Sequence, residues 1–207
     1  MSIIAIATNK GGAGKTTLSI NLAAGLAHHG SAAILDADPQ RSALQWHAMS
    51  SNPEALPVFE ASDEIREQIV ELQKDFQYIV TDCPPSVEAA QTYDVLLSSD
   101  VVLIPVQPSP MDLWATTYIE DAIVQVREHN PSLAAMLVIN QVEVRSTLSK
   151  LIGDALTEVD VPVAATPIRR RAIYRTSILE GRSVYEMGKR GAEAAAELDQ
   201  LIDEVIK

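Results

Sequence analysis

The sequence is poor in cysteine and in positive charge. Its single cysteine, Cys83, excludes an internal disulfide and a cysteine-rich zinc or iron–sulfur site within one chain. The 16 Lys and Arg residues are outnumbered by 28 Asp and Glu residues, which gives a net charge of −12 at pH 7. This balance excludes a protein whose whole surface binds nucleic acid.

The sequence also lacks an apolar run long enough to cross a membrane and the pattern of a signal peptide. We therefore expect a cytoplasmic protein. The chain has 207 residues, of which 47% are hydrophobic, enough for one globular domain with a real core. We expect a single domain over residues 1–207 without an N-terminal helix-turn-helix domain, because the first predicted strand begins at residue 3.

Short apolar runs alternate with helical patterns along the whole sequence. The predicted strands cover residues 3–8, 32–36, 57–60, 78–82, 101–106, 135–140 and 163–166. The predicted helices cover residues 15–29, 40–50, 63–74, 87–98, 113–129, 147–159, 171–179 and 192–206. Most of the strands are apolar throughout, as in a parallel sheet that is buried on both faces. The alternation predicts an α/β fold with a doubly wound, mainly parallel sheet and helices on both faces.

A glycine-rich loop separates the first predicted strand from the first helix. Glycine backbone and a helix N-terminus together form a cradle for phosphate. Lys15 is expected to reach the β- and γ-phosphates, Thr16 to bind Mg²⁺ and Thr17 to hold the α-phosphate. The alternative is a glycine-rich turn without a ligand. The loop residues are Lys10, Gly11, Gly12, Ala13, Gly14, Lys15, Thr16 and Thr17.

Carboxylates follow two of the predicted strands. Asp36 and Asp38 end the second strand, where one carboxylate is expected near the Mg²⁺ water shell and the other near an attacking water. The alternative is a pair of helix-capping aspartates. Asp82 ends another apolar strand and is expected to bind Mg²⁺. Cys83 reads as a small buried side chain rather than a nucleophile.

These motifs resemble the ParA/MinD family of deviant Walker A ATPases, and most closely the small, ParF-type ParA proteins of plasmid partition. The resemblance covers nearly the whole chain. It is carried by the two-lysine loop and by the segments Asp36-Ala37-Asp38-Pro39-Gln40, Asp82-Cys83-Pro84-Pro85, Pro108-Ser109-Pro110 and Tyr174-to-Glu186. It implies a P-loop NTPase fold of the deviant Walker A type, with ATP and Mg²⁺ as cofactors.

The resemblance also assigns roles to single residues. It implies that Lys10 crosses to the nucleotide of a partner subunit, and that Asp38 is the catalytic aspartate. Asn140 is implied to bind adenine, with Pro167 and Ile168 as the backbone edge and the apolar wall for the base. Asp112 and Trp114 resemble a further family motif, with core packing as an equal alternative for Trp114.

The function implied by the resemblance is an ATP-driven switch. ATP-bound homodimers bind nonspecific DNA on the nucleoid, and a centromere-binding or cargo-adaptor protein stimulates slow ATP hydrolysis. Plasmid partition is the leading expectation. The alternatives are the positioning of a protein cargo such as carboxysomes and a protein-scaffold switch without DNA. No membrane partner is expected, because the polar positions of the C-terminal helix are acidic.

Basic residues concentrate between positions 166 and 190, where seven of them stand against two acids. We expect this segment to contact DNA phosphates without reading the bases. The alternative is a set of surface charges that pair with acids. The candidate DNA contacts are Arg169, Arg170, Arg171, Arg175, Lys189 and Arg190.

Overall fold

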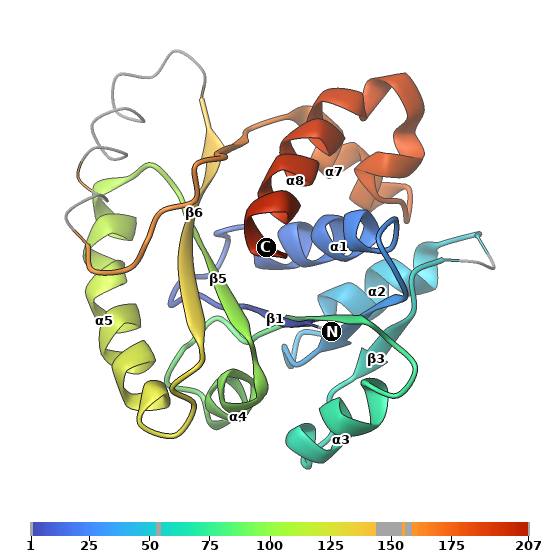
Figure 1. The fold of residues 1–207 in the computed structure, drawn as a ribbon. Coiled ribbons are helices and arrows are strands. Elements are labelled where there is room, and N and C mark those ends of the chain that lie inside the picture. The colour runs from blue at the N-terminus through green and yellow to red at the C-terminus, as the bar shows by residue number, and fades with distance from the viewer. Residues whose placement is uncertain (1, 53–54, 144–154, 156–158, 207) are drawn as a thin grey trace.

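A computed structural model describes residues 2–52, 55–143, 155 and 159–206 of the chain. The helix predicted at 147–159 therefore lies almost entirely outside the described residues, as do the side chains of Asp112 and Trp114. The described residues form one sheet of seven strands with helices against both faces (Figure 1). The prediction of a doubly wound α/β fold is confirmed.

All paired strands of the sheet run parallel, in the order β3-β2-β4-β1-β5-β6-β7. Within the central pairs, Asp82 at the end of β4 lies opposite Ile6 of β1 on one side and Asp36 of β2 on the other. The carboxyl ends of three strands therefore meet at one edge, where ligands bind in folds of this kind. The strands are β1 (Ser2–Ile6), β2 (Ala32–Asp36), β3 (Val58–Glu60), β4 (Tyr78–Asp82), β5 (Val101–Val106), β6 (Ala134–Val142) and β7 (Ile168–Arg169).

The helices form a layer on each face of the sheet. One layer contains α1 (Lys15–Leu26), α2 (Ser42–Met49), α7 (Ala172–Leu179), the 3₁₀ helix η1 (Val184–Arg190) and α8 (Ala192–Val205). The other layer contains α3 (Ile65–Leu72), α4 (Ala90–Ser98) and α5 (Pro110–Arg127). Figure 1 shows α1 and α8 packed on the same side of the sheet.

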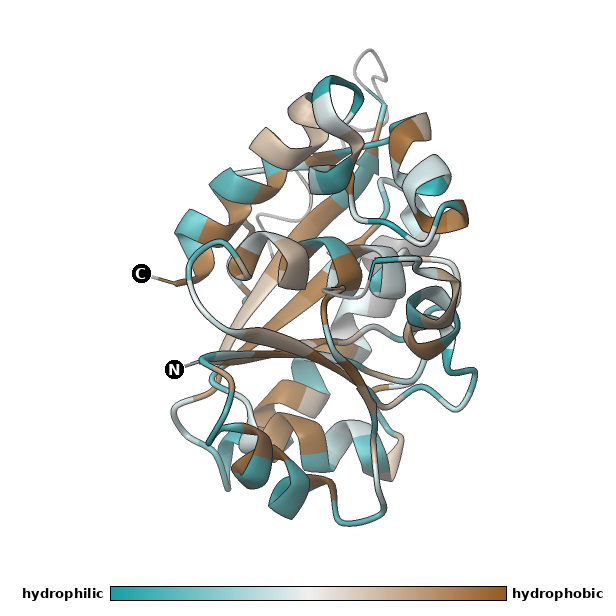
Figure 2. Ribbon diagram, turned by 90° about the vertical axis from the view of Figure 1, so that its right-hand side faces the viewer, coloured by the Kyte–Doolittle hydropathy of each residue, from teal (hydrophilic) through white to brown (hydrophobic). Residues whose placement is uncertain are grey.

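The strands supply most of the core. Ile4 and Ala5 are both fully buried, and because side chains alternate along a strand they join the two different apolar clusters above and below the sheet. Figure 2 shows the same pattern, with apolar strands inside and polar residues on the outer helix faces. Burial on both faces explains why these strands read as continuous apolar runs in the sequence.

The predicted strand at 163–166 is wrong. Val163 makes only an isolated bridge to Leu137, and the strand at this edge is β7, two residues long. Proline at positions 162 and 167 removes a backbone donor on each side. The N–H groups of Ala165 and Thr166 bond instead to the carboxylate of Glu204. The helix η1 was also missing from the sequence-based expectation.

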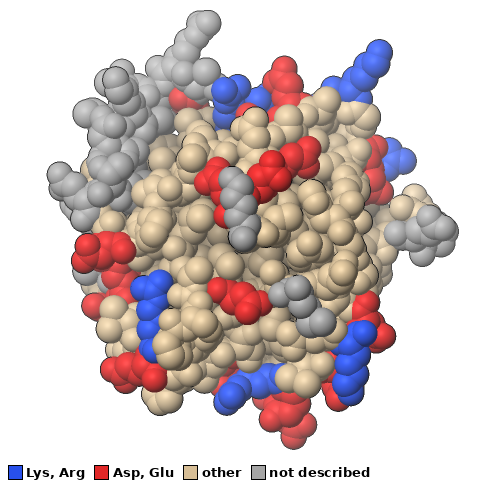
Figure 3. Space-filling view, in the orientation of Figure 1, with Lys and Arg blue, Asp and Glu red and all other residues tan. Residues whose placement is uncertain are grey.

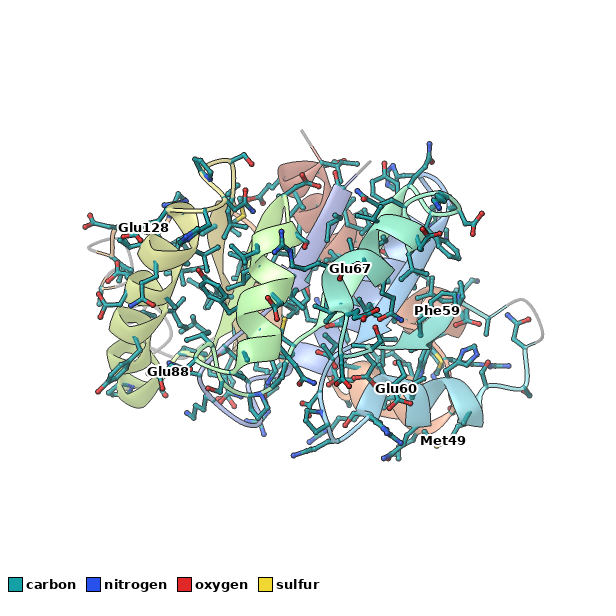
Figure 4. The ribbon with its side chains drawn as sticks, turned by 90° about the horizontal axis from the view of Figure 1, so that it is seen from below. Met49, Phe59, Glu60, Glu67, Glu88 and Glu128 are labelled. Atoms are coloured by element: carbon teal, nitrogen blue, oxygen red, sulfur yellow. The ribbon has the colours of Figure 1, made fainter. Side chains whose placement is uncertain are left out.

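Charged side chains lie on the outside of these layers. On the face shown in Figure 3, acidic side chains occur at the centre as well as around the edge. Figure 4 shows the underside, where Glu60 ends β3 close to α2, whose last residue is Met49. Glu60 forms an ion pair with Arg41, which precedes α2. Both partners are largely exposed, so this pair contributes little to stability.

Candidate nucleotide site

The phosphate loop leaves β1 and turns into α1 through two glycines in the left-handed region. Gly12 has a φ of 80° and Gly14 a φ of 90°. A Cβ atom on Gly14 would lie 2.7 Å from the amide nitrogen of Asn140, so this position has neither the backbone freedom nor the space for a side chain. Gly14 is the N-cap of α1, and no side chain caps that end of the helix. The first turn of α1 is thus left open to an anion.

The loop is fixed to the sheet edge by three side-chain amides. Asn140 donates to the carbonyl of Ala13 at 2.8 Å, and Gln107 donates to the carbonyl of Gly12 at 2.8 Å. Gln141 also reaches the Gly12 carbonyl, at 3.4 Å, from a backbone with a φ of 59°. Such a conformation is sparsely populated outside glycine and tends to occur at functional sites. Bonds to the carbonyls hold the loop in a concave form suited to bind an anion through its N–H groups.

Asp82 is a fully buried carboxylate at the centre of this edge. Its Oδ1 accepts a hydrogen bond from the Ser19 hydroxyl at 3.0 Å, while its Oδ2 has no partner among the described residues. Burial raises the pKa of Asp82 to about 7, against the opposing effect of the Thr16 hydroxyl. A buried carboxylate oxygen without a partner, next to the Thr16 hydroxyl, suits the oxygen-ligand preference of Mg²⁺.

Asp36 and Asp38 shape the turn between β2 and α2. Asp36 accepts hydrogen bonds from the N–H groups of Asp38, at 3.2 Å, and Leu44, at 3.0 Å, and burial raises its pKa. Asp38 accepts from the N–H of Gln40 at 2.9 Å and is buried. Leu44 lies in the first turn of α2, so Asp36 helps to hold the start of that helix as well as lying at the acidic strand edge. Asp38 also lines the phosphate cavity, which leaves the catalytic interpretation open for it.

Two adjoining cavities follow the phosphate loop. The larger, of about 340 Å³, is lined by Lys15, Thr16 and Asp38 together with the loop glycines. The smaller, of about 150 Å³, lies against Asn140 and Ile168. The two share Gly14, Thr17 and Gln141, so a single ligand can occupy both.

The sizes and linings suggest triphosphate in the larger cavity and a base in the smaller. Pro167 is exposed and directly precedes Ile168. Lys10 is half-buried and is not among the described residues that line either cavity. Its crossing to a second subunit stays a prediction.

The structure divides the basic segment into two groups. Arg171 is paired with Glu197 at 2.6 Å and with Glu193, and these partners raise its pKa. Arg169 and Arg170 also meet acids, the latter at 2.8 Å from Glu143. The pairing interpretation thus applies to these three arginines. Arg175, Lys189 and Arg190 are exposed, and no ion pair joins them to another described residue.

Several positioning residues were missed by the sequence analysis. Ser19 holds Asp82, and Asn9 accepts a hydrogen bond from the N–H of Val87 at 2.9 Å, which ties the phosphate loop to the segment after β4. Gln107 and Gln141 hold the loop from the other side. Their positions just after β5 and within the end of β6 were the only sequence signal.

Within the described part of the chain, no three His, Cys, Asp or Glu side chains gather into a group that could hold a metal ion. Among the described helices, none is long and apolar enough to span a membrane.

The sequence model for the CobQ/CobB/MinD/ParA nucleotide binding domain matches residues 4–184. The chain belongs to this family. It is 41% identical over 206 residues to the maintenance of carboxysome distribution protein A of Halothiobacillus neapolitanus, covering 98% of this chain and 95% of that protein. It is 29% identical to the ParA protein of Rhizobium radiobacter, over 95% and 91% of the two chains.

Solved structures share the fold. An ATP complex of a Cyanothece McdA variant superimposes with a TM-score of 0.77 at 18% identity, over 99% of this chain and 96% of that one. MinD of Pyrococcus horikoshii in complex with Mg-ADP superimposes with a TM-score of 0.75 at 22% identity, over 100% of this chain and 96% of that one. The chain is therefore an ATPase of the ParA/MinD type, and homologous structures bind ATP or ADP with magnesium.

Asp82→Asn should stabilise the nucleotide-free protein more at pH 8 than at pH 5. The pKa of Asp82 is about 7 in the folded state, against the ordinary 3.8 of a solvated aspartate, so ionisation of Asp82 lowers the stability of the folded protein as pH rises from about 4 to about 7. Asparagine removes that cost. Thermal midpoints of both proteins at the two pH values measure it.

The matched control is Asp63→Asn, which changes an exposed carboxylate and should alter the midpoint little at either pH. An Asp82→Asn midpoint that rises equally at both pH values, or falls at pH 8, would contradict the buried, proton-linked carboxylate.

Proposed function

We propose that this ATPase is a dimerising switch that positions a protein cargo, namely carboxysomes. The observation that carries the proposal is the 41% identity to a carboxysome distribution protein along nearly the full length of both chains. A second carboxysome distribution protein, from Gloeobacter kilaueensis, is 30% identical over 98% of this chain. The two cavities and the acidic strand ends supply the nucleotide site that such a switch requires.

The residues of the site divide the work of hydrolysis. Lys15 and the loop N–H groups hold the β- and γ-phosphates, and Asn140 and Ile168 hold the base. Mg²⁺, when bound, neutralises charge on the phosphates. Thr16, Asp36 and Asp82 are the groups at hand to hold it and its water shell. Asp38 orients the attacking water, and Lys10 of a second subunit neutralises charge on the transferring phosphoryl group.

Plasmid partition is the second candidate. It is favoured by the 29% identity to a ParA protein over 95% of this chain. The sequence motifs taken alone favour plasmid partition over a protein cargo. The higher identity to a carboxysome distribution protein moves the protein cargo ahead of it. In either case a partner protein stimulates hydrolysis and the ATP-bound dimer binds nonspecific DNA on the nucleoid.

The proposed DNA surface centres on the exposed cations that no ion pair joins to another described residue. Lys189 and Arg190 lie at the end of η1, and Arg175 lies on α7. Arg169, Arg170 and Arg171 already have acidic partners, so they contribute less. Binding through phosphates alone is independent of base sequence and weakens steeply with salt.

Lys10→Ala should bind ATP with nearly unchanged affinity and yet hydrolyse it at least about a hundredfold more slowly, because a phosphoryl-neutralising cation supplied in trans is worth ~10³–10⁵ in rate. Single-turnover hydrolysis and sedimentation with ATP measure the rate and the dimer. Lys74→Ala, an exposed lysine on the opposite layer, is the control. A Lys10→Ala protein with normal turnover would refute the trans role.

Changing Lys189 and Arg190 together to Glu should abolish ATP-dependent DNA binding. The matched control changes Arg66 and Lys74 to Glu, which alters the net charge equally on the α3 layer and should keep most of the binding. Binding to random-sequence duplex is measured with ATP, with ADP and without nucleotide, at two salt concentrations. If both double variants bind as the unchanged protein does, or lose binding equally, the η1 surface is not the DNA contact.

Deletion of the gene in its own host tests the cargo. Carboxysomes carrying a fluorescent shell protein should lose their regular spacing and collect in clusters, while plasmid copy number and retention stay normal. Complementation with the Lys15→Ala variant should fail, because the phosphates lose their lysine. If carboxysomes kept their regular spacing and plasmids were lost, carboxysome positioning would be refuted and plasmid partition would be supported instead.

A further inference from the structure

The wall of the smaller cavity is a segment with two different faces. Residues 165–171, here called the base segment, run from the end of the isolated bridge through β7 to the start of α7. On one side, Ile168 and Arg169 to Arg171 line the cavity beside the phosphate loop. On the other side the segment meets α8, the last helix of the chain. Whatever holds this segment therefore sets the shape of the cavity.

The sheet holds the base segment weakly. β7 has two residues, and its pairing with β6 is limited to Asn140 opposite Ile168 and Val142 opposite Arg169, with a register shift between them. Before β7, Pro167 has no N–H to donate. A ladder this short leaves most backbone groups of the segment to find partners elsewhere.

Glu204 of α8 supplies partners at the start of the segment. Its carboxylate accepts hydrogen bonds from the N–H of Ala165 at 2.8 Å, the N–H of Thr166 at 2.9 Å and the Thr166 hydroxyl at 2.5 Å. Three donors from two successive residues on one carboxylate fix the direction in which the chain enters β7. Hydrogen bonds to an ionised acceptor are stronger than neutral ones.

Glu197 of α8 supplies partners at the end of the segment. Its carboxylate accepts hydrogen bonds from the N–H of Arg169 at 3.2 Å and from the Arg171 guanidinium at 2.6 Å and 3.4 Å. The Glu197 side chain is only 13% exposed and that of Arg171 21%, so water screens this pair less than a surface pair. Glu197 and Glu204 are seven residues apart, which places them on the same face of α8, two turns from each other.

We propose that Glu197 and Glu204 are positioning residues for nucleotide binding, and that α8 sets the affinity of the site for the base of ATP through them. The proposal rests on the proposed placement of the base in the smaller cavity. Removing either carboxylate leaves donors of the base segment without their partner, and the segment relaxes away from the shape that forms the cavity wall. The hydrogen bonds and ion pairs of both glutamates go to the base segment rather than to the phosphate loop, so we expect the loop to keep its own binding.

The test compares ATP with inorganic tripolyphosphate, which carries the phosphates without a base. Affinities of both are measured by titration calorimetry with Mg²⁺ for the full chain, for Glu204→Ala and for Glu197→Gln. Each variant should bind ATP at least about tenfold more weakly, because it leaves more than one donor of the base segment without its ionised acceptor, and should bind tripolyphosphate as the unchanged protein does.

The controls come from the same helix. Asp203→Ala removes the exposed neighbour of Glu204, and Glu193→Gln removes a carboxylate that bonds to the Arg171 guanidinium but not to the backbone of the base segment. Both controls should keep the affinity for ATP. If Glu197→Gln fails to fold, Glu204→Ala tests the same claim from the other end of the segment.

The outcomes separate the two claims. If the unchanged protein binds ATP more tightly than tripolyphosphate and both glutamate variants keep that preference, the positioning role is refuted and the base cavity stands. Equal weakening of both ligands would also refute it, because that result indicates a general loss of structure. If the unchanged protein shows no preference for ATP over tripolyphosphate, the placement of the base fails, and the positioning role fails with it.

Discussion

A carboxylate buried at the end of the central strands constrains the rest of the nucleotide site. Asp82 has no exposed surface and lies opposite Asp36 in the strand register, so two acids share one poorly hydrated edge. Their repulsion and their loss of solvation must be offset locally. The offsets come from α1, which brings Lys15, Thr16 and Ser19 to the same place. For α1 to begin beside the carboxyl end of β4, the chain must turn back sharply after β1, in the short loop between Ile6 and Lys15.

That reversal explains the glycines and the amides around them. Gly12 and Gly14 adopt backbone angles that let the loop turn tightly, and Asn140, Gln107 and Gln141 hold its carbonyl oxygens. The result is a concave loop next to two acids that are only partly compensated. A nucleotide with its cation supplies the missing compensation, so binding and stability of this edge are linked. A nucleotide-driven switch needs this kind of link, because the bound nucleotide then changes the stability of the structure around the site.

The sequence predicted the parts of this arrangement that depend on local pattern. The bounds of β2, β4 and β5 were predicted correctly, because continuous apolar runs end in polar residues at the sheet edge. Parallel strands align their carboxyl ends, so Asp36 and Asp82, which end two of these strands, were expected to lie at the same edge of the sheet. The phosphate loop was likewise visible, because glycines, lysine and hydroxyls occur in a fixed order between a strand and a helix.

The parts that depend on distant partners were not visible. The strand expected at 163–166 was displaced to β7, because Glu204, some 40 residues later, takes the N–H groups that a ladder would have used. The charges of the basic segment could be counted, but nothing in the sequence indicated that Glu197 and Glu143 would pair with three of its arginines. Counting charges in the sequence gives the net charge of a segment, but it does not show which of its cations lack an acidic partner in the fold.

These pairings bear on how an acidic protein could hold DNA. Acids on α8 pair with Arg169 and Arg171 beside the nucleotide cavity. Among the candidate DNA contacts in the described residues, those without an ion pair are Arg175 on α7 and Lys189 and Arg190 on η1. So few phosphate contacts give weak binding at physiological salt, because the counterion contribution grows with the number of contacts. Two such surfaces brought together in a dimer double the contacts and act at a high effective concentration. Pairing of arginines inside the monomer would therefore make DNA binding depend on the dimer, and through the dimer on ATP.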